Sequence, residues 1–299
     1  MRRDRAVRRS AGPPVRCAVM LAVLAAASPL AAQDTLTFTY APLVGTGART
    51  ITEIRTVTTF TGFPGLPDGS TLEEERRIEA RHRSMGESNG LWLVEAVIDT
   101  VWSRRRLDQG PWRDRVDSLP VRKPAVALVS SQFAVTGFRS SGPDDGEVFR
   151  PVGAMVAGLD FAFPGEPVAA GQTFSTGGRI HVRVRTTPES GLGVDETVFG
   201  DLALTLDSIV RESGDELAYL RLGGGLTPRT TSLAGEAGST AGTYTGAFVG
   251  RLVWSRRWNA FVSGVARVRV EGRVTAETAR GLVAATAVWD RTVRHQVRP

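Results

Sequence analysis

The sequence predicts an all-β protein, in which antiparallel meanders form a curved sheet or an open barrel with one or two short helices. Three observations support this fold class. After residue 33, apolar side chains alternate with polar ones along most of the chain, and the alternating runs are rich in threonine, valine and isoleucine, which favour strands. Short turns with Gly, Asp or Ser separate the runs, so neighbouring runs are expected to pair as antiparallel strands.

Residues 1–32 are expected to be a secretory signal peptide rather than part of the fold. Arginines precede a short apolar stretch from Cys17 to Leu30, and Ala31 and Ala32 provide the small residues that a signal peptidase requires. The apolar stretch is too short to cross a bilayer, and no later stretch has about 18 consecutive apolar residues. We therefore expect cleavage after Ala32, a periplasmic or extracellular location, and no transmembrane helix.

The expected strands follow one another through the rest of the chain. The clearest alternating or β-branched runs lie at 36–40, 50–59, 92–102, 180–184, 202–206, 217–219, 244–254, 260–275 and 282–297. Residues 71–85 are rich in Glu and Arg, but helical spacing gives them no apolar stripe. We interpret them as a polar strand that pairs with residues 91–102 through a type I′ turn at Asn89-Gly90.

A helix and several breaks are expected between these strands. Pro151, which suits the first turn of a helix, precedes the compact apolar run 152–161, which we interpret as the short helix. Residues 103–123 are polar and contain two prolines, so they are expected to interrupt the sheet. Residues 223–242 are rich in Gly, Ser and Thr and predict a long loop. The proline- and glycine-rich stretch 164–171 is interpreted as a connector.

The chain after the leader, residues 33–299, is expected to form one β-rich domain. The pentapeptide Val-Trp-Ser-Arg-Arg occurs at 101–105 and again at 253–257, each time at the end of an alternating run. This repeat leaves open a division into two similar halves, 33–163 and 164–299.

Charge and cysteine content exclude several classes of function. The chain has a net charge of +6, but most of this excess lies on the arginines of the leader. The remaining chain is close to neutral, which argues against a nucleic-acid partner. Cys17 is the single cysteine, so the chain after the leader has no disulfide, thiol nucleophile or cysteine-based metal site. We expect no cofactor.

Residues 86–90 fit the Gly-x-Ser-x-Gly pattern of serine hydrolases, with Ser88 in the position of the nucleophile. That pattern is catalytic only where a strand turns sharply into a helix. Here Asn89-Gly90 is typical of a hairpin turn, and another strand-like run follows. We therefore expect no catalytic residue and a protein that is not an enzyme, with a hydrolase that uses Ser88 as the enzymatic alternative.

Three histidines occur, namely His82, His181 and His295. No pair of them has the spacing of metal ligands, and each has an arginine within two residues, which would repel a cation. We expect them on solvated strand faces, and we expect no metal site.

Several short motifs carry a resemblance to a known family: Phe163-Pro164, Pro167-Val168, Gly171, Phe174, the run 204–209 and Gly242-Thr243. With these motifs the chain resembles a family of exported bacterial β-rich proteins whose function is unknown. The resemblance provides no catalytic residues. The architecture is more distantly similar to the half-barrels of periplasmic lipoprotein carriers, which implies an apolar cavity.

From the alternation we expect one face of the sheet to line an apolar cavity or groove that binds a lipid-like molecule. The expected ligand-binding residues lie on the more apolar sides of their strands: Trp92, Val94, Ile98, Trp102, Leu204, Leu206 and Trp254. The partner is expected to be an apolar or amphipathic ligand or a protein of the cell envelope. The alternative for the sheet face is a core that the two β halves fill completely.

An outer-membrane β-barrel is the alternative for the whole chain, because alternating runs of about ten residues are typical of such barrels as well. Two features argue against it. The chain ends in Val297-Arg298-Pro299 without a terminal aromatic residue, and arginines recur through most of the expected strands.

Overall fold

The computed structural model describes residues 35–42, 44–45, 47–63, 65–117, 124–139, 162–185, 193–235, 238–278 and 281–298. Regular structure in these residues consists entirely of strands, which confirms the predicted all-β class. The strands are β1 (Thr35–Leu36), β2 (Gly47–Thr61), β3 (Ser70–Ser88), β4 (Leu91–Leu107), β5 (Arg113–Asp117), β6 (Ala125–Ser130), β7 (Val135–Arg139), β8 (Val168–Ala169), β9 (Thr173–Arg185), β10 (Gly193–Glu212), β11 (Asp215–Gly235), β12 (Gly238–Ser255), β13 (Ala260–Thr278) and β14 (Gly281–Arg298).

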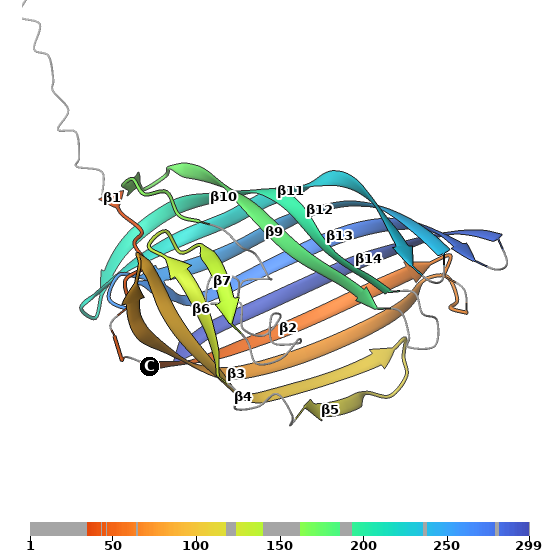
Figure 1. Ribbon diagram of the computed structural model, residues 1–299, viewed down its shortest axis with the longest axis horizontal. Helices are drawn as coiled ribbons and strands as arrows, with labels where there is room; N and C mark the ends of the chain where they lie inside the picture. The colour runs from red at the N-terminus through yellow and green to blue at the C-terminus, as the bar shows by residue number, and fades with distance from the viewer. Residues whose placement is uncertain are drawn as a thin grey trace, which may run out of the picture. The chain divides into compact units, whose positions relative to one another are not determined.

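Twelve strands form one antiparallel sheet in the order β7-β6-β4-β3-β2-β14-β13-β12-β11-β10-β9, and β5 pairs with β4 beside this path. Most neighbours in the order are also neighbours in the sequence, as in a meander. There are two exceptions. β4 pairs with β6 although β5 lies between them in the sequence, and β14 pairs with both β13 and β2 and so joins the two ends of the chain in the middle of the sheet. Figure 1 shows these long strands side by side in one curved layer.

The sheet curves around its buried face. Phe133, in the turn between β6 and β7, lies 5.6 Å from Trp254 of β12 between ring centroids, although these strands are far apart in the strand order. Such a contact brings the two ends of the order together over the same face, as the curved layer in Figure 1 also shows. We call this buried side the inner face and the opposite side, where most of the charged residues lie, the outer face.

Aromatic side chains fill the inner face near the end of the sheet where β1 and β8 lie. Phe38 stacks on Phe163 with 4.5 Å between the ring centroids, and Trp254 meets Phe261 edge-on at 5.2 Å. Two backbone hydrogen bonds hold the covering segments, from Tyr40 N to the Ser131 carbonyl oxygen and from Phe163 N to the Gln132 carbonyl oxygen. At this end the chain therefore covers its own sheet, and offset and edge-to-face pairs stabilise the contact.

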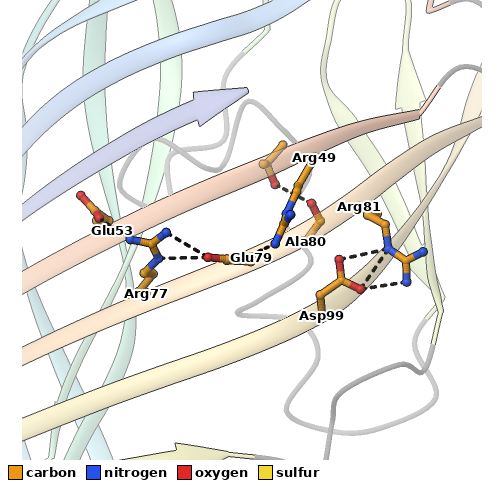
Figure 2. Close-up of polar contacts among 8 residues, drawn as sticks. Arg49, Glu53, Arg77, Glu79, Ala80, Arg81 and Asp99 are labelled. Atoms are coloured by element: carbon orange, nitrogen blue, oxygen red, sulfur yellow. Dashed lines mark hydrogen bonds and ion pairs between the residues drawn. The ribbon is translucent and has the colours of Figure 1, made fainter. Parts of the chain in front are cut away.

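The predicted polar strand is confirmed as β3, which pairs with β4 across Asn89 and Gly90. Both turn residues have positive φ, 55° and 76°, as a type I′ turn requires. Acidic side chains of β3 face arginines of its neighbours on the outer face. Figure 2 shows Glu79 accepting hydrogen bonds from Arg49 of β2 and from Arg77 of β3 itself, and Arg77 also contacts Glu53 of β2.

These outer-face ion pairs explain how a strand rich in Glu and Arg can be stable. Glu73 and Glu75 also accept hydrogen bonds from Arg106 and Arg104 of β4. Exposed pairs of this kind contribute only a few tenths of a kcal/mol each, up to about 1 kcal/mol. The ladder therefore makes β3 compatible with its neighbours, while burial on the inner face supplies most of the stability.

One prediction for the connections is wrong. Residues 223–242 were expected to form a loop, but they belong to the paired strands β11 and β12, apart from residues 236–237, which lie outside the described residues. Glycine is needed here because the strands pack closely: a Cβ at Gly224 would meet the backbone carbonyl oxygen of Asp201. The Gly content reflects this close approach rather than a loop.

Two of the predicted features, the helix at 152–161 and the leader, lie outside the described residues, and a third was predicted only in part. The expected break at 103–123 is partly occupied by strand, since β4 continues to Leu107 and β5 follows. Where the structure describes the chain, it contains no helix that is long and apolar enough to cross a membrane.

Candidate functional site on the inner face

The inner face carries two apolar clusters. The larger cluster extends from β4 through β14 to β10 and includes the aromatic end of the sheet. The smaller cluster, on β3 and β4, consists of Ile78, Ala80, Ala96, Ile98 and Val101. Ile54 of β2 packs against both clusters, so the apolar surface continues from one to the other.

Six of the seven residues that were expected to line this face belong to these clusters. Val94, Leu204, Leu206 and Trp254 are buried in the larger cluster, and Trp92 is partly buried and packs against it. Ile98 is fully buried in the smaller cluster. The alternation in the sequence was sufficient to place these six side chains on the inner face.

Trp102 does not lie on the inner face, which corrects the sequence-based placement. The pairing of β3 with β4 shifts between Glu79 and Ala80, so that Asp99 is an extra residue in β4. This β-bulge reverses the alternation beyond it. Val101 therefore points inward and is only 1% exposed, while Trp102 lies with the outer-face side chains, with the Arg104 guanidinium 5.2 Å from its ring.

A group of polar residues interrupts the inner face where β3, β2 and β14 lie side by side. It consists of Thr50, Thr52, His82, Ser84 and His295, and we call it the buried histidine site. Nε2 of His82 lies 3.0 Å from the Thr50 hydroxyl oxygen, and Nδ1 of His295 lies 3.1 Å from the Thr52 hydroxyl oxygen. The strand register fixes this geometry. His295 pairs with Thr52, and His82 pairs with the residue two positions before Thr50.

Three polar atoms of the site are enclosed and have no hydrogen-bond partner: Nδ1 of His82, Oγ of Ser84 and Nε2 of His295. Ser84 and His295 are only 4% and 3% exposed. Leaving a buried polar atom unpaired costs about 1–3 kcal/mol, and most such atoms in native proteins have a partner. Three of them in one group distinguish this site from an ordinary strand face.

Both histidines of the site are neutral at pH 7. Burial lowers the pKa of His82 to about 4. Burial, followed by repulsion from His82, lowers the pKa of His295 to about 3. The site can therefore donate and accept hydrogen bonds, but it carries no charge of its own.

The expectation that the histidines are solvated is wrong for His295, which is 3% exposed, and for Nδ1 of His82, which is enclosed although the residue as a whole is only half-buried. The arginines next to them in the sequence lie on the opposite face, where Arg81 and Arg83 bind Asp99 and Glu95. The alternation that exposes these arginines also buries the histidines between them. The alternation was thus the signal that could have revealed the site, and the neighbouring arginines obscured it. The side chain of His181 lies outside the described residues.

Ser88 lies at the end of β3, directly before the Asn89-Gly90 turn, and pairs with Leu91 of β4. The segment is therefore strand, turn and strand. A nucleophile elbow needs a strand followed by a helix, so the local geometry does not present Ser88 as such a nucleophile.

In the part of the chain that the structure describes, no three His, Asp or Glu side chains gather in a group that could hold a metal ion.

No protein-family model matches the chain, and no curated protein is significantly similar to it.

Proposed function

We propose that the protein is exported and binds an apolar or amphipathic ligand on the inner face of its sheet, without catalysing a reaction. The observation that carries this proposal is the juxtaposition of enclosed, unpaired polar atoms with an apolar surface. A ligand with an apolar tail and a polar head would contact both. Its head would provide the missing hydrogen-bond partners at the buried histidine site.

Small side chains next to the site support this arrangement. Ala96 of β4 pairs directly with His82, and Ala80 pairs with Thr50. Both alanines belong to the smaller apolar cluster with Ile98. An apolar tail that leaves the histidines therefore meets alanine and isoleucine side chains at once, and burial of each methylene group of the tail contributes about 0.8 kcal/mol.

Export is supported by the sequence alone, through the arginine-rich leader, its short apolar stretch and Ala31-Ala32. The absence of cysteine after the leader is compatible with either redox environment. Mass spectrometry of the protein from the cell envelope tests this part of the proposal. A mature N-terminus at Gln33 is expected, and an envelope protein that retains Met1 would contradict it.

Two tryptophans of β4 provide a matched test of ligand binding. Trp92 packs against the inner-face cluster, whereas Trp102 lies on the outer face beside Arg104. A fluorescent apolar probe, such as N-phenyl-1-naphthylamine, is titrated into the full-length mature protein and into the variants Trp92→Ala and Trp102→Ala. We expect Trp92→Ala to weaken probe binding at least about fivefold, which corresponds to roughly 1 kcal/mol.

Trp102→Ala is the control and is expected to bind the probe like the unaltered protein. Circular dichroism spectra of all three proteins establish that the sheet is intact. Absence of probe binding to the unaltered protein would contradict the proposal, and so would equal weakening by the two substitutions.

A further inference from the structure

We propose that the ligand's head is an uncharged group that both donates and accepts hydrogen bonds, such as a hydroxyl group or an amide, and not a carboxylate or phosphate. This inference rests on the proposed function and specifies the ligand that the same site takes. It follows from the unpaired hydrogen-bonding atoms of the site and from the placement of the surrounding charges.

His82 has one enclosed ring nitrogen without a partner, Nδ1. The hydroxyl of Thr50 lies 3.0 Å from Nε2 of His82 and 3.4 Å from the carbonyl oxygen of Ala80. Whether this hydroxyl donates to Nε2 or accepts from it depends on the tautomer of the ring. Nδ1 of the neutral ring therefore either donates or accepts one hydrogen bond. A head that can do both pairs with Nδ1 in either tautomer.

Oγ of Ser84 and Nε2 of His295 are the other two unpaired atoms of the site. Oγ of Ser84 can both donate and accept, and Nε2 of His295 takes whichever role the Thr52 hydroxyl leaves to it. A hydroxyl group both donates and accepts a hydrogen bond, so it matches whichever of the unpaired atoms it meets. An ether or ester oxygen only accepts, so it can pair only with an atom that donates.

The charges around the site also favour an uncharged head. An anionic head would need a cation, but the arginines next to the histidines in the sequence lie on the outer face, where Arg81 and Arg83 are paired with Asp99 and Glu95. Arg291 does lie on the inner face, where its Nε donates to the Thr56 hydroxyl oxygen. It is four residues from His295 along β14, which corresponds to roughly 13 Å. A carboxylate at the buried histidine site would therefore be desolvated without a compensating charge, which is strongly unfavourable.

Three ligands with the same twelve-carbon chain separate these possibilities. Dodecanol has a head that both donates and accepts hydrogen bonds, dodecyl methyl ether has a head that only accepts, and dodecanoate has an anionic head. Each displaces N-phenyl-1-naphthylamine from the mature protein at pH 7.5. We expect dodecanol to bind at least about tenfold more tightly than either of the other two, equivalent to about 1.4 kcal/mol.

Two variants locate the head. His82→Phe removes the unpaired ring nitrogen, and Ser84→Ala removes an unpaired hydroxyl without disturbing the Thr50 contact. Each is expected to reduce the preference for dodecanol over the ether. Thr58→Val is the control, because Thr58 is a buried threonine of the same strand and face as Thr50 but lies outside the site. Its dodecanol preference should be unchanged.

The outcomes distinguish the inference from the function on which it rests. If the apolar probe itself does not bind, the proposed function fails. If the probe binds but dodecanoate or the ether displaces it as well as dodecanol does, the proposed function stands and the inference is overturned. A tenfold preference for dodecanol that survives in both His82→Phe and Ser84→Ala would also overturn it, since the head would then lie elsewhere on the inner face.

Discussion

At the residue scale, the buried histidine site makes the fold depend on the protonation of two side chains. His82 and His295 are each held by one threonine hydroxyl, and neither has a carboxylate partner among the described residues that could stabilise a charged ring. Protonation would place a second donor and a positive charge in an apolar surrounding. The neutral forms are therefore the ones that the folded sheet accommodates.

This environment predicts that the protein loses stability on mild acidification. The pKa of both histidines is lowered from 6.5, to about 4 for His82 and about 3 for His295. Below about pH 6.5 the unfolded chain binds protons that the folded chain does not, so the free energy of unfolding falls as the pH decreases toward 4. The expected slope is roughly 1 kcal/mol per pH unit for each histidine. Urea unfolding at several pH values between 7.5 and 5 measures it.

The double variant His82→Leu, His295→Leu is the control for this slope. Carboxylates such as Glu79 have a pKa below the usual 4.5 because arginines donate hydrogen bonds to them, so the stability that they contribute is lost only at lower pH. The variant should therefore show a much flatter profile between pH 6.5 and 5. Equal slopes for the unaltered protein and the variant would show that the two histidines are not buried in the neutral form.

At the element scale, a single extra residue decides which side chains of β4 face inward. The alternation predicted from the sequence is correct up to Ile98 and reversed from Val101 onward, because the bulge at Asp99 shifts the pairing with β3. A bulge leaves little trace in the sequence, since it depends on how two strands pair rather than on either strand alone. Trp102 could therefore not be placed from its own strand.

Deleting Asp99 tests the importance of the bulge. The deletion forces either Trp102 onto the inner face and Val101 onto the outer face, or a shift of the whole register with β3. Either change disrupts the smaller apolar cluster, and we expect a loss of about 3 kcal/mol or more in the free energy of unfolding. Asp99→Ala keeps the bulge and removes only the exposed contact with Arg81, so it should cost less than about 1 kcal/mol. Similar urea midpoints for the two variants would argue against the bulge.

Two adjacent glycines of β11 test how closely this strand packs against β10. They lie in the stretch whose composition had predicted a loop. A Cβ at Gly224 would clash with the backbone of Asp201, whereas a Cβ at Gly223 would have no atom within 4 Å. Gly224→Ala should therefore lower the free energy of unfolding by about 1–3 kcal/mol. Gly223→Ala should leave it unchanged or raise it by up to about 1 kcal/mol, because alanine restricts the unfolded chain. If both substitutions are harmless in thermal unfolding experiments, β10 and β11 are not packed in this way.

At the scale of the whole molecule, the fold class followed from the sequence, but the order of the strands did not. Period-two alternation and turn residues are local signals, and they predicted antiparallel strands and the hairpin at Asn89-Gly90. The pairing of β14 with β2 joins residues from opposite ends of the chain, and no local pattern specifies such a contact. The candidate site depends on this same pairing, since Thr52 and His295 meet across it. Six of the expected inner-face residues could thus be identified from alternation, whereas the polar site among them could not.

If the inner face holds an amphipathic molecule with an uncharged head, that molecule should remain bound when the protein is isolated. Native mass spectrometry of the full-length mature protein, taken from the cell envelope without detergent, detects such a complex. We predict one non-covalent adduct per chain, released by mild activation as a neutral molecule that has an apolar chain and a hydroxyl or amide group. A bare mature chain that also fails to gain such an adduct after incubation with dodecanol would contradict the account.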